Sequence, residues 1–214
     1  MAAVNAFRTS SVAVVACAAL SVMTLAACGS DSDTATASTS SSPVSDVFTP
    51  PSIPETKPED SPCPPAAPAN TGAPEWTLPG ATGSVAVTGA TDKTAPQIDV
   101  EAPFSVTETQ VQTLKAGDGP VVAETATVLV CYMGVNGRDG SVFDSSYQQG
   151  APVDFSLDGV VPGFQKAIAG QKVGSTVAVA MVPADGYPEG QPSAGIQPGD
   201  TLIFAIKILD ATSR

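Results

Sequence analysis

The sequence of 214 residues contains no histidine and only four cysteines, which are dispersed along the chain. Zinc sites and cysteine proteases depend on such residues, so neither is expected, and we expect no other metal or cofactor. Basic residues are also scarce, with 9 lysines and arginines against 21 acidic residues and a formal net charge of −12. A chain this acidic has no electrostatic means of holding a nucleic-acid backbone, which excludes nucleic acid as a partner.

The sequence also lacks an apolar run long enough to cross a bilayer well. The run within residues 1–28 is short and rich in alanine, follows the basic residue Arg8, and ends in LAAC at Cys28. These features are typical of an export signal. The small residues before Cys28 resemble the bacterial lipobox, which implies a lipidated cysteine and a lipid anchor at the extracytoplasmic face of the cell membrane. A plain secretory signal with a chance cysteine is the alternative.

Large apolar residues are almost missing from residues 29–75, where serine, threonine, proline and alanine dominate. Such a segment cannot bury enough surface to offset its ordering entropy, so we expect a disordered tether. Because Cys17 lies in the export signal and Cys28 is expected to be lipidated, Cys63 and Cys131 remain. In an oxidising exterior these two either form a disulfide or stay free thiols, and the sequence leaves both open.

From residue 76 the sequence changes to short alternating runs that predict β-strands. Residues 76–113 are expected to form an N-terminal β extension, with alternation at 84–89 and 97–100. Residues 114–214 contain stronger runs, which lie at 126–134, 153–157, 175–183 and 201–209. One helix is predicted at 162–170, where a proline suits the start and a glycine can end it. The fold class predicted is α+β, with antiparallel strands around one short helix.

Alternation also predicts which face of its strand each side chain takes. Val128, Val130 and Tyr132 share one face, so Cys131 is expected on the outward face. The last run has a single apolar face formed by Leu202, Phe204, Ile206 and Ile208. Three side chains are assigned to the core and given no further role, namely Phe155, Leu202 and Ile206.

Seven motifs follow one another along residues 114–214. They are LKAGDGPVV, VCYMG, GSVFDSS, GVVPGF, QKVGS, GYPEG and GIQPGDTLIFAIKIL. In this order and at these spacings they resemble FKBP-type peptidyl-prolyl cis-trans isomerases. The resemblance implies a twisted antiparallel β-sheet wrapped around one short α-helix, with an apolar cavity between helix and sheet. Residues 76–113 lie outside that minimal domain.

The resemblance also implies a set of site residues. The implied catalytic residues are Tyr132, Phe143, Asp144, Tyr187 and Phe204. The implied substrate-binding residues are Val153, Val160, Val161, Phe164 and Ile196. In such a site Asp144 accepts a hydrogen bond from Tyr132, and Phe164 forms the floor under the proline ring. The backbone N–H of Val161 and the hydroxyl of Tyr187 hold substrate carbonyls.

The implied reaction explains how a chain without histidine can be an enzyme. Rotation about an X–Pro amide breaks no covalent bond, and its barrier of about 20 kcal/mol comes from lost resonance. An aromatic cavity disfavours the planar, charge-separated amide relative to the twisted one. The resemblance therefore implies a monomeric isomerase that assists the folding of exported, proline-containing polypeptides at the outer face of the membrane. Macrolides are the inhibitors it implies.

Several positions depart from the pattern of the family. Phe164 stands where many members have tryptophan, Gln149 stands where an arginine often partners the aspartate, and Val153 replaces an aromatic residue. Pro192 and the Gly195-Ile196 pair shorten or soften the loop wall after Tyr187. These departures predict a shallower cavity with a weaker electrostatic field. They leave open a proline-peptide-binding or chaperone module with the same fold and little turnover, and, more remotely, an inert surface lipoprotein.

Overall fold

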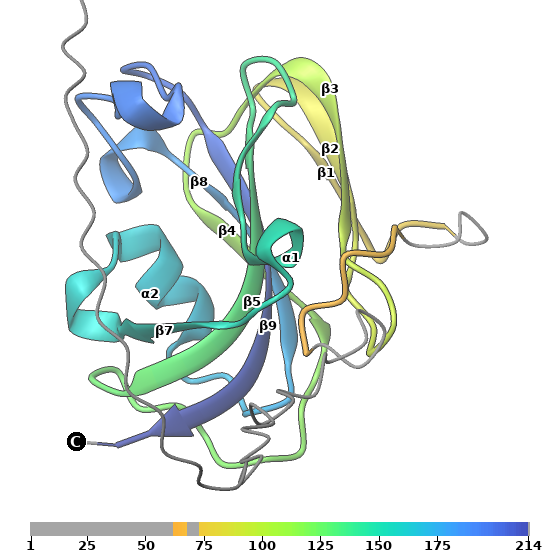
Figure 1. Cartoon of the computed structure of the whole chain (residues 1–214). Helices are drawn as coiled ribbons and strands as arrows, with labels where there is room; N and C mark the ends of the chain where they lie inside the picture. The colour runs from red at the N-terminus through yellow and green to blue at the C-terminus, as the bar shows by residue number, and fades with distance from the viewer. Residues whose placement is uncertain (1–61, 68–72, 214) are drawn as a thin grey trace, which may run out of the picture. The chain divides into compact units, whose positions relative to one another are not determined.

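The computed structural model of the protein describes residues 62–67 and 73–213. The predicted export signal, the predicted lipidation site Cys28 and most of the predicted tether lie outside the described residues. Figure 1 shows helix α2 (Pro162–Ile168) on one side of the larger sheet and a smaller sheet on its other side. The predicted α+β fold, an antiparallel sheet wrapped around one short helix, is confirmed. Within the described part of the chain, no helix has the length and apolarity needed to cross a membrane.

The larger sheet has six antiparallel strands. They are β4 (Gln110–Lys115), β5 (Thr127–Asn136), β6 (Val142–Ser145), β7 (Val153–Ser156), β8 (Thr176–Met181) and β9 (Leu202–Thr212). The order is β4-β8-β9-β5-β6, and β7 pairs with the first half of β5. The long central strands place Tyr132 opposite Ile206 and Gly134 opposite Phe204. Because β4 pairs with β8, this sheet includes residues 110–113, which the sequence had placed in the extension.

The face of the larger sheet toward α2 holds the main hydrophobic core. Val128, Val130 and Tyr132 lie on this face, as alternation predicted. The predicted shared face of β9 is confirmed, because the same core contains Leu202, Phe204, Ile206 and Ile208. Each fully buried side chain of this size contributes about 1.5–3 kcal/mol relative to exposure, so the alternating pattern fixes which way the sheet faces.

The opposite face of the larger sheet is covered by a three-stranded antiparallel sheet. Its strands are β1 (Trp76–Pro79), β2 (Thr82–Thr88) and β3 (Gln97–Ser105), in the order β1-β2-β3. The alternating runs predicted at 84–89 and 97–100 lie in β2 and β3. Val85, Val87 and Phe104 pack against Ile203 and three alanines of the larger sheet, which are Ala178, Ala180 and Ala205. Alanine side chains allow the two sheets to approach closely.

Two helices flank the larger sheet. Helix α2 begins at Pro162 and ends two residues earlier than predicted, because the Ala169 N–H makes the last helical bond and Gly170 turns the chain at φ 79°. Helix α1 (Ser146–Gln149) was not predicted, since four residues are too few to show a helical period. It buries Tyr147 on the side of the sheet opposite α2.

The two cysteines that lie after the predicted export signal form a disulfide. Cys63 and Cys131 are bonded with a Cα–Cα distance of 5.5 Å, and both are 0% exposed. The prediction that Cys131 points outward is wrong, because segment 62–67 and Tyr147 cover that face of β5. The Ala95 N–H also donates to the carbonyl of Ala66 at 2.7 Å. The predicted tether therefore does not describe residues 62–67, whose prolines and alanines gave no sign of order in the sequence.

Candidate active site

A cavity of about 360 Å³ opens between α2 and the larger sheet. Ten residues line it, namely Tyr132, Phe143, Asp144, Phe155, Gly159, Val160, Val161, Phe164, Tyr187 and Phe204. Eight of them were predicted as site residues. They come from β5, β6, β7 and β9, from α2 and the segment leading into it, and from the loop after β8. Residues far apart in the sequence therefore share one cavity.

The cavity walls are aromatic rings that meet edge to face. The ring of Phe164 lies 5.4 Å from Phe204, 5.5 Å from Phe155 and 6.0 Å from Tyr132, at interplanar angles of 73° to 87°. Phe143 meets Phe204 at 5.4 Å and 89°. Edge-to-face pairs are favourable because the positive edge of one ring meets the negative face of the other. The result is an apolar surface whose rings hold one another in place.

Gly134 on β5 makes room for the contact between Phe143 and Phe204. A Cβ atom at this position would come within 2.6 Å of Phe143 and 2.8 Å of Phe204. Any larger residue would have to push one of these rings aside. The glycine that ends the VCYMG motif is thus required for the shape of the cavity.

Tyr132 and Asp144 provide the polar pair of the cavity. The Tyr132 hydroxyl donates to Oδ2 of Asp144 at 2.5 Å, as the sequence resemblance implied, and its backbone N–H donates to Oγ of Ser146 at 2.9 Å. Burial raises the pKa of Tyr132 above its usual value, and the hydrogen bond to Asp144 acts in the same direction. The hydroxyl therefore stays protonated at neutral pH and remains a donor. Among the described residues no lysine or arginine forms an ion pair with Asp144.

Val161 and Tyr187 bring further polar groups to the cavity lining. The carbonyl of Val161 accepts the N–H groups of Phe164 and Gln165 at 3.0 and 3.2 Å and so starts α2. In the part of the chain that the structure describes, no acceptor bonds the N–H of Val161 itself. Tyr187 lies in the loop between β8 and β9 and carries a hydroxyl to the cavity wall. Val161 and Tyr187 both line the cavity, so their polar groups are candidates for contacts with a bound polypeptide.

Comparison with known proteins places this site in a family. Residues 119–209 match the family model of FKBP-type peptidyl-prolyl cis-trans isomerases. The chain is 32% identical over 117 residues to a probable FK506-binding protein of Corynebacterium glutamicum, covering 54% of this chain and 98% of that protein. The chain belongs to the FKBP-type isomerase family.

Longer relatives share this FKBP domain. Over 99 residues the chain is 38% identical to a probable FKBP-type peptidyl-prolyl cis-trans isomerase of Haemophilus influenzae, covering 46% of this chain and 41% of that protein. The crystal structure of FkpA from Escherichia coli is similar with a TM-score of 0.44 and 35% identity, covering 49% of this chain and 48% of that one. This chain therefore spans less than half the length of these two relatives.

Two of the predicted site residues do not line the cavity of this FKBP domain. Val153 pairs with Val130 at the start of β7 and packs against the core. Ile196 belongs to the same loop as Tyr187, and its side chain is buried in the core. Any contact of Val153 or Ile196 with a substrate stays a prediction.

Two cavity residues were missed by sequence reasoning. Phe155 was assigned to the core alone, yet its ring lies 5.6 Å from Tyr132 and lines the cavity. Alternation places Phe155 on the same strand face as Val153, which was predicted to line the cavity. This could have indicated Phe155 as a cavity residue, because its larger side chain extends further from the strand than that of Val153. Gly159 had no such signal. The sequence predicts a shallower cavity because Val153 replaces an aromatic residue. Phe155 supplies an aromatic ring on the same strand.

Proposed function

We propose that this protein is a peptidyl-prolyl cis-trans isomerase whose reaction takes place in the aromatic cavity. The observation that supports this most is the hydrogen bond between Tyr132 and Asp144 at the edge of a cavity whose other walls are phenylalanine rings. Membership of the FKBP family supports the same reaction. Proline-containing polypeptides are the proposed substrates.

The proposed mechanism relies on environment rather than on proton transfer. The proline ring rests on Phe164, and the rotating amide lies among the rings of Tyr132, Phe143 and Phe204. These rings solvate the planar, charge-separated amide less well than water does, so the twisted amide with its smaller charge separation gains relative to it. Donors that meet the substrate carbonyls in the twisted geometry add to this difference. The N–H of Val161 and the hydroxyl of Tyr187 are the donors proposed.

The proposal extends to location and binding partners. A lipid anchor at Cys28 would hold the domain at the outer face of the cell membrane, and the exported polypeptides folding there would be its substrates. The lipobox-like residues before Cys28 support this location, and so does the disulfide between Cys63 and Cys131, which suits an oxidising compartment. Macrolide inhibitors would occupy the same apolar cavity. A monomer suffices, because one chain supplies all ten cavity residues.

The test compares two buried tyrosines. Residues 29–214 would be expressed without the anchor, and cis-trans exchange of proline peptides that differ in the preceding residue would be measured. Tyr132→Phe removes the hydroxyl bound to Asp144 and should lower kcat/KM about tenfold or more. Tyr147→Phe is the matched control, because it removes a buried hydroxyl on the other face of the sheet and should leave kcat/KM unchanged. Equal rates in all three proteins would contradict the proposed site.

A peptide-binding module with little turnover is the second candidate function. It is favoured by Asp144, which has no cationic partner among the described residues, and by Gln149 where the family often has arginine. Without that cation the field across the cavity is weaker. A folded wild-type protein that binds the peptides and leaves their exchange at the uncatalysed rate would establish this function in place of the enzyme.

A further inference from the structure

The cavity wall that contains Tyr187 is a loop rather than a strand. The loop connects β8 to β9 and contains two short 3-10 helices, η3 (Pro183–Asp185) and η4 (Pro192–Ala194). It is closed by its own backbone bonds: the Gly190 N–H donates to the carbonyl of Tyr187 at 2.9 Å, and Gln191 and Ile196 exchange two bonds of 2.8 and 3.1 Å. The position of Tyr187 therefore depends on where the segment around Ile196 is held.

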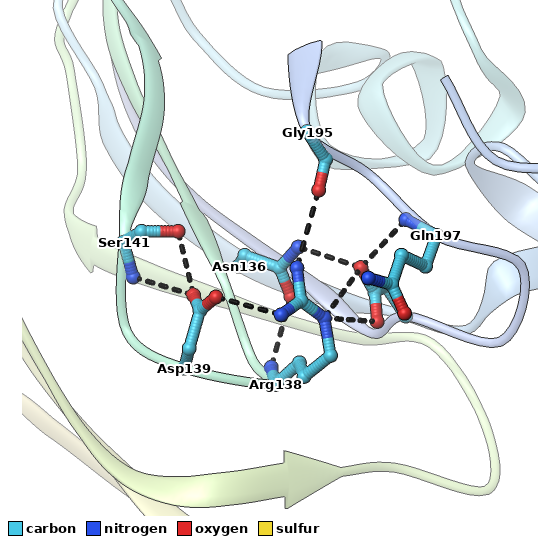
Figure 2. Close-up of polar contacts among 7 residues, drawn as sticks. Asn136, Arg138, Asp139, Ser141, Gly195 and Gln197 are labelled. Carbon is cyan, nitrogen blue, oxygen red and sulfur yellow. Dashed lines mark hydrogen bonds and ion pairs between the residues drawn. The ribbon is translucent and has the colours of Figure 1, made fainter. Parts of the chain in front are cut away.

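A buried carboxylate lies where this loop joins β9. The side chain of Asp200 is only 6% exposed. It accepts hydrogen bonds from Nδ2 of Asn136 at 2.6 Å, the N–H of Gln197 at 2.8 Å and Nε of Arg138 at 3.2 Å. Figure 2 shows these donors converging from the turn after β5 and from the loop. Because a buried carboxylate is costly without partners, this cluster fixes the two segments against each other.

Arg138 reaches beyond Asp200 to the loop itself. Its Nη2 donates to the carbonyl of Gly195 at 3.2 Å, and its Nη1 pairs with Asp139 at 2.8 Å (Figure 2). The backbone N–H of Arg138 donates to Oδ1 of Asn136 at 2.9 Å. The donors of a guanidinium lie in one rigid plane. The side-chain contacts of Arg138 with Asp200, Gly195 and Asp139 therefore fix these three groups relative to one another. One side chain thus sets the distance between Gly195 and the turn.

The same turn leads into β6, which forms another wall of the cavity. The Asn136 N–H donates to the carbonyl of Ser141 at 2.8 Å, and β6 then carries Phe143 and Asp144 to the cavity. Arg138 therefore connects the wall that holds Asp144 with the loop that holds Tyr187. It does so without lining the cavity.

We propose that Arg138 is a positioning residue for substrate binding, which holds the Tyr187 loop at a fixed distance from β6. The proposal rests on the proposed isomerase function and adds a determinant of affinity to it. The rings of Tyr132, Phe164 and Phe204 are carried by β5, α2 and β9 and do not depend on this link. Loss of the Arg138 contacts therefore lowers the affinity for the polypeptide but leaves the aromatic rings around the rotating amide in place.

A second ion pair holds the other end of the loop and allows a comparison. Nζ of Lys166 on α2 lies 2.8 Å from both carboxylate oxygens of Asp185, and Thr109 also donates to Asp185. In this pair the Lys166 and Asp185 side chains are 56% and 18% exposed, whereas in the other pair Arg138 and Asp200 are 37% and 6% exposed. Exposed pairs hold geometry weakly. The Arg138 link is accordingly the stronger restraint on the loop.

The experiment combines kinetics with a probe on the loop. The chain contains three tyrosines, so incorporation of 3-fluorotyrosine gives three ¹⁹F resonances, and Tyr187→Phe identifies the one from the loop. The variant Arg138→Gln keeps a polar side chain at a 37% exposed position and should fold. The matched control Lys93→Gln removes one charge from an exposed residue in the turn between β2 and β3. All proteins are titrated with the peptide Ala-Leu-Pro-Phe.

Arg138→Gln should raise KM about three- to tenfold and leave kcat within about twofold, the size expected for a residue that acts through others. The Tyr187 resonance should shift or broaden, and the Tyr147 resonance should not change. Arg138→Lys keeps a charge beside Asp200 but cannot also reach the carbonyl of Gly195, so its KM should be intermediate. Lys93→Gln should match the wild type.

Three results would overturn the proposal. The first is a folded Arg138→Gln protein with unchanged KM and an unchanged Tyr187 resonance. The second is a uniform change of all three tyrosine resonances, which indicates a general structural effect. The third is a fall in kcat alone. If the wild type shows no isomerisation, the proposed function fails, and the peptide Kd from the same ¹⁹F titration replaces KM in deciding on Arg138. If Arg138→Gln does not fold, Arg138→Lys decides by the same two readouts.

Discussion

The two faces of the larger sheet are packed in different ways. Toward α2 the strands present aromatic and large aliphatic side chains, and the seven-residue helix leaves a cavity of about 360 Å³ among them. Toward β1–β3 the same strands present Ala178, Ala180, Ala205 and Ile203, and a second sheet covers them. Side-chain size at alternate positions thus decides which face closes and which stays open.

Neighbouring residues on β9 illustrate the difference. Ile203 is 0% exposed between the two sheets, where its methyl groups have partners on all sides. Phe204, the next residue, points to the other face, where it meets Phe143 and Phe164 edge to face and Tyr132 at a tilt of 46°. Rings in this arrangement support one another and still leave space for a ligand. Both faces therefore contribute a buried core, but only the α2 face also leaves a cavity that can bind a ligand.

The largest effect is expected from Ile203→Ala, which tests the closed face. It leaves a void between two sheets that cannot collapse easily, so the free energy of unfolding should fall by about 2–5 kcal/mol. The measurement is urea unfolding followed by circular dichroism. Peptide exchange without denaturant should keep wild-type kcat/KM, because Ile203 does not line the cavity. A large loss of activity in the folded variant would show that the two faces are not separable.

A smaller loss of stability and a larger loss of activity are expected from Phe143→Ala on the open face. Phe143 is half-buried at the cavity wall, and removing it widens a space already open to water. The free energy of unfolding should fall by about 1 kcal/mol, while kcat/KM should fall about tenfold. The same two assays apply. Unchanged exchange rates would show that Phe143 is not a catalytic residue. They would also show that substitutions on the open face need not affect activity more than Ile203→Ala does.

The smallest effect concerns acid stability at the edge of the open face. The hydrogen-bonded ammonium of Lys166, followed by the Thr109 hydroxyl, lowers the pKa of Asp185 below its usual value. A depressed pKa gives stability that is present above the unfolded pKa of about 3.9 and lost as the pH falls through the folded value. Because Lys166 is exposed, the amount should be below about 1 kcal/mol.

Urea midpoints at pH 7 and at pH 3 measure this contribution. Asp185→Asn should reduce the loss of stability below about pH 4, because it removes the titrating carboxylate; Lys166→Gln should reduce this loss less, because the Thr109 hydroxyl still donates to Asp185. A variant as acid-sensitive as the wild type would show that the pair contributes nothing to stability. Kinetic constants at pH 7 should change less than in Arg138→Gln.

Sequence reasoning succeeded where a local pattern carries the information. Alternation placed Tyr132 and Phe204 on the α2 face because side chains of a strand alternate with a period of two. The proline and glycine around 162–170 marked the helix within two residues of its end. Sequence reasoning failed for Cys131, because the second face of β5 is covered by residues 62–67, which are far away in the sequence.

The amino-acid sequence by itself indicated most of the strands along the chain, the shared face of the apolar side chains on β5 and on β9, and eight of the ten residues that line the cavity. These follow from local periodicity and from motifs that resemble those of one family. Only the tertiary structure decided that Cys63 is buried against β5, that Phe155 faces the cavity, and that Arg138 reaches Asp200 and Gly195. Each of these depends on contacts between segments that are distant in the sequence, and local sequence patterns carry no information about the distances between such segments.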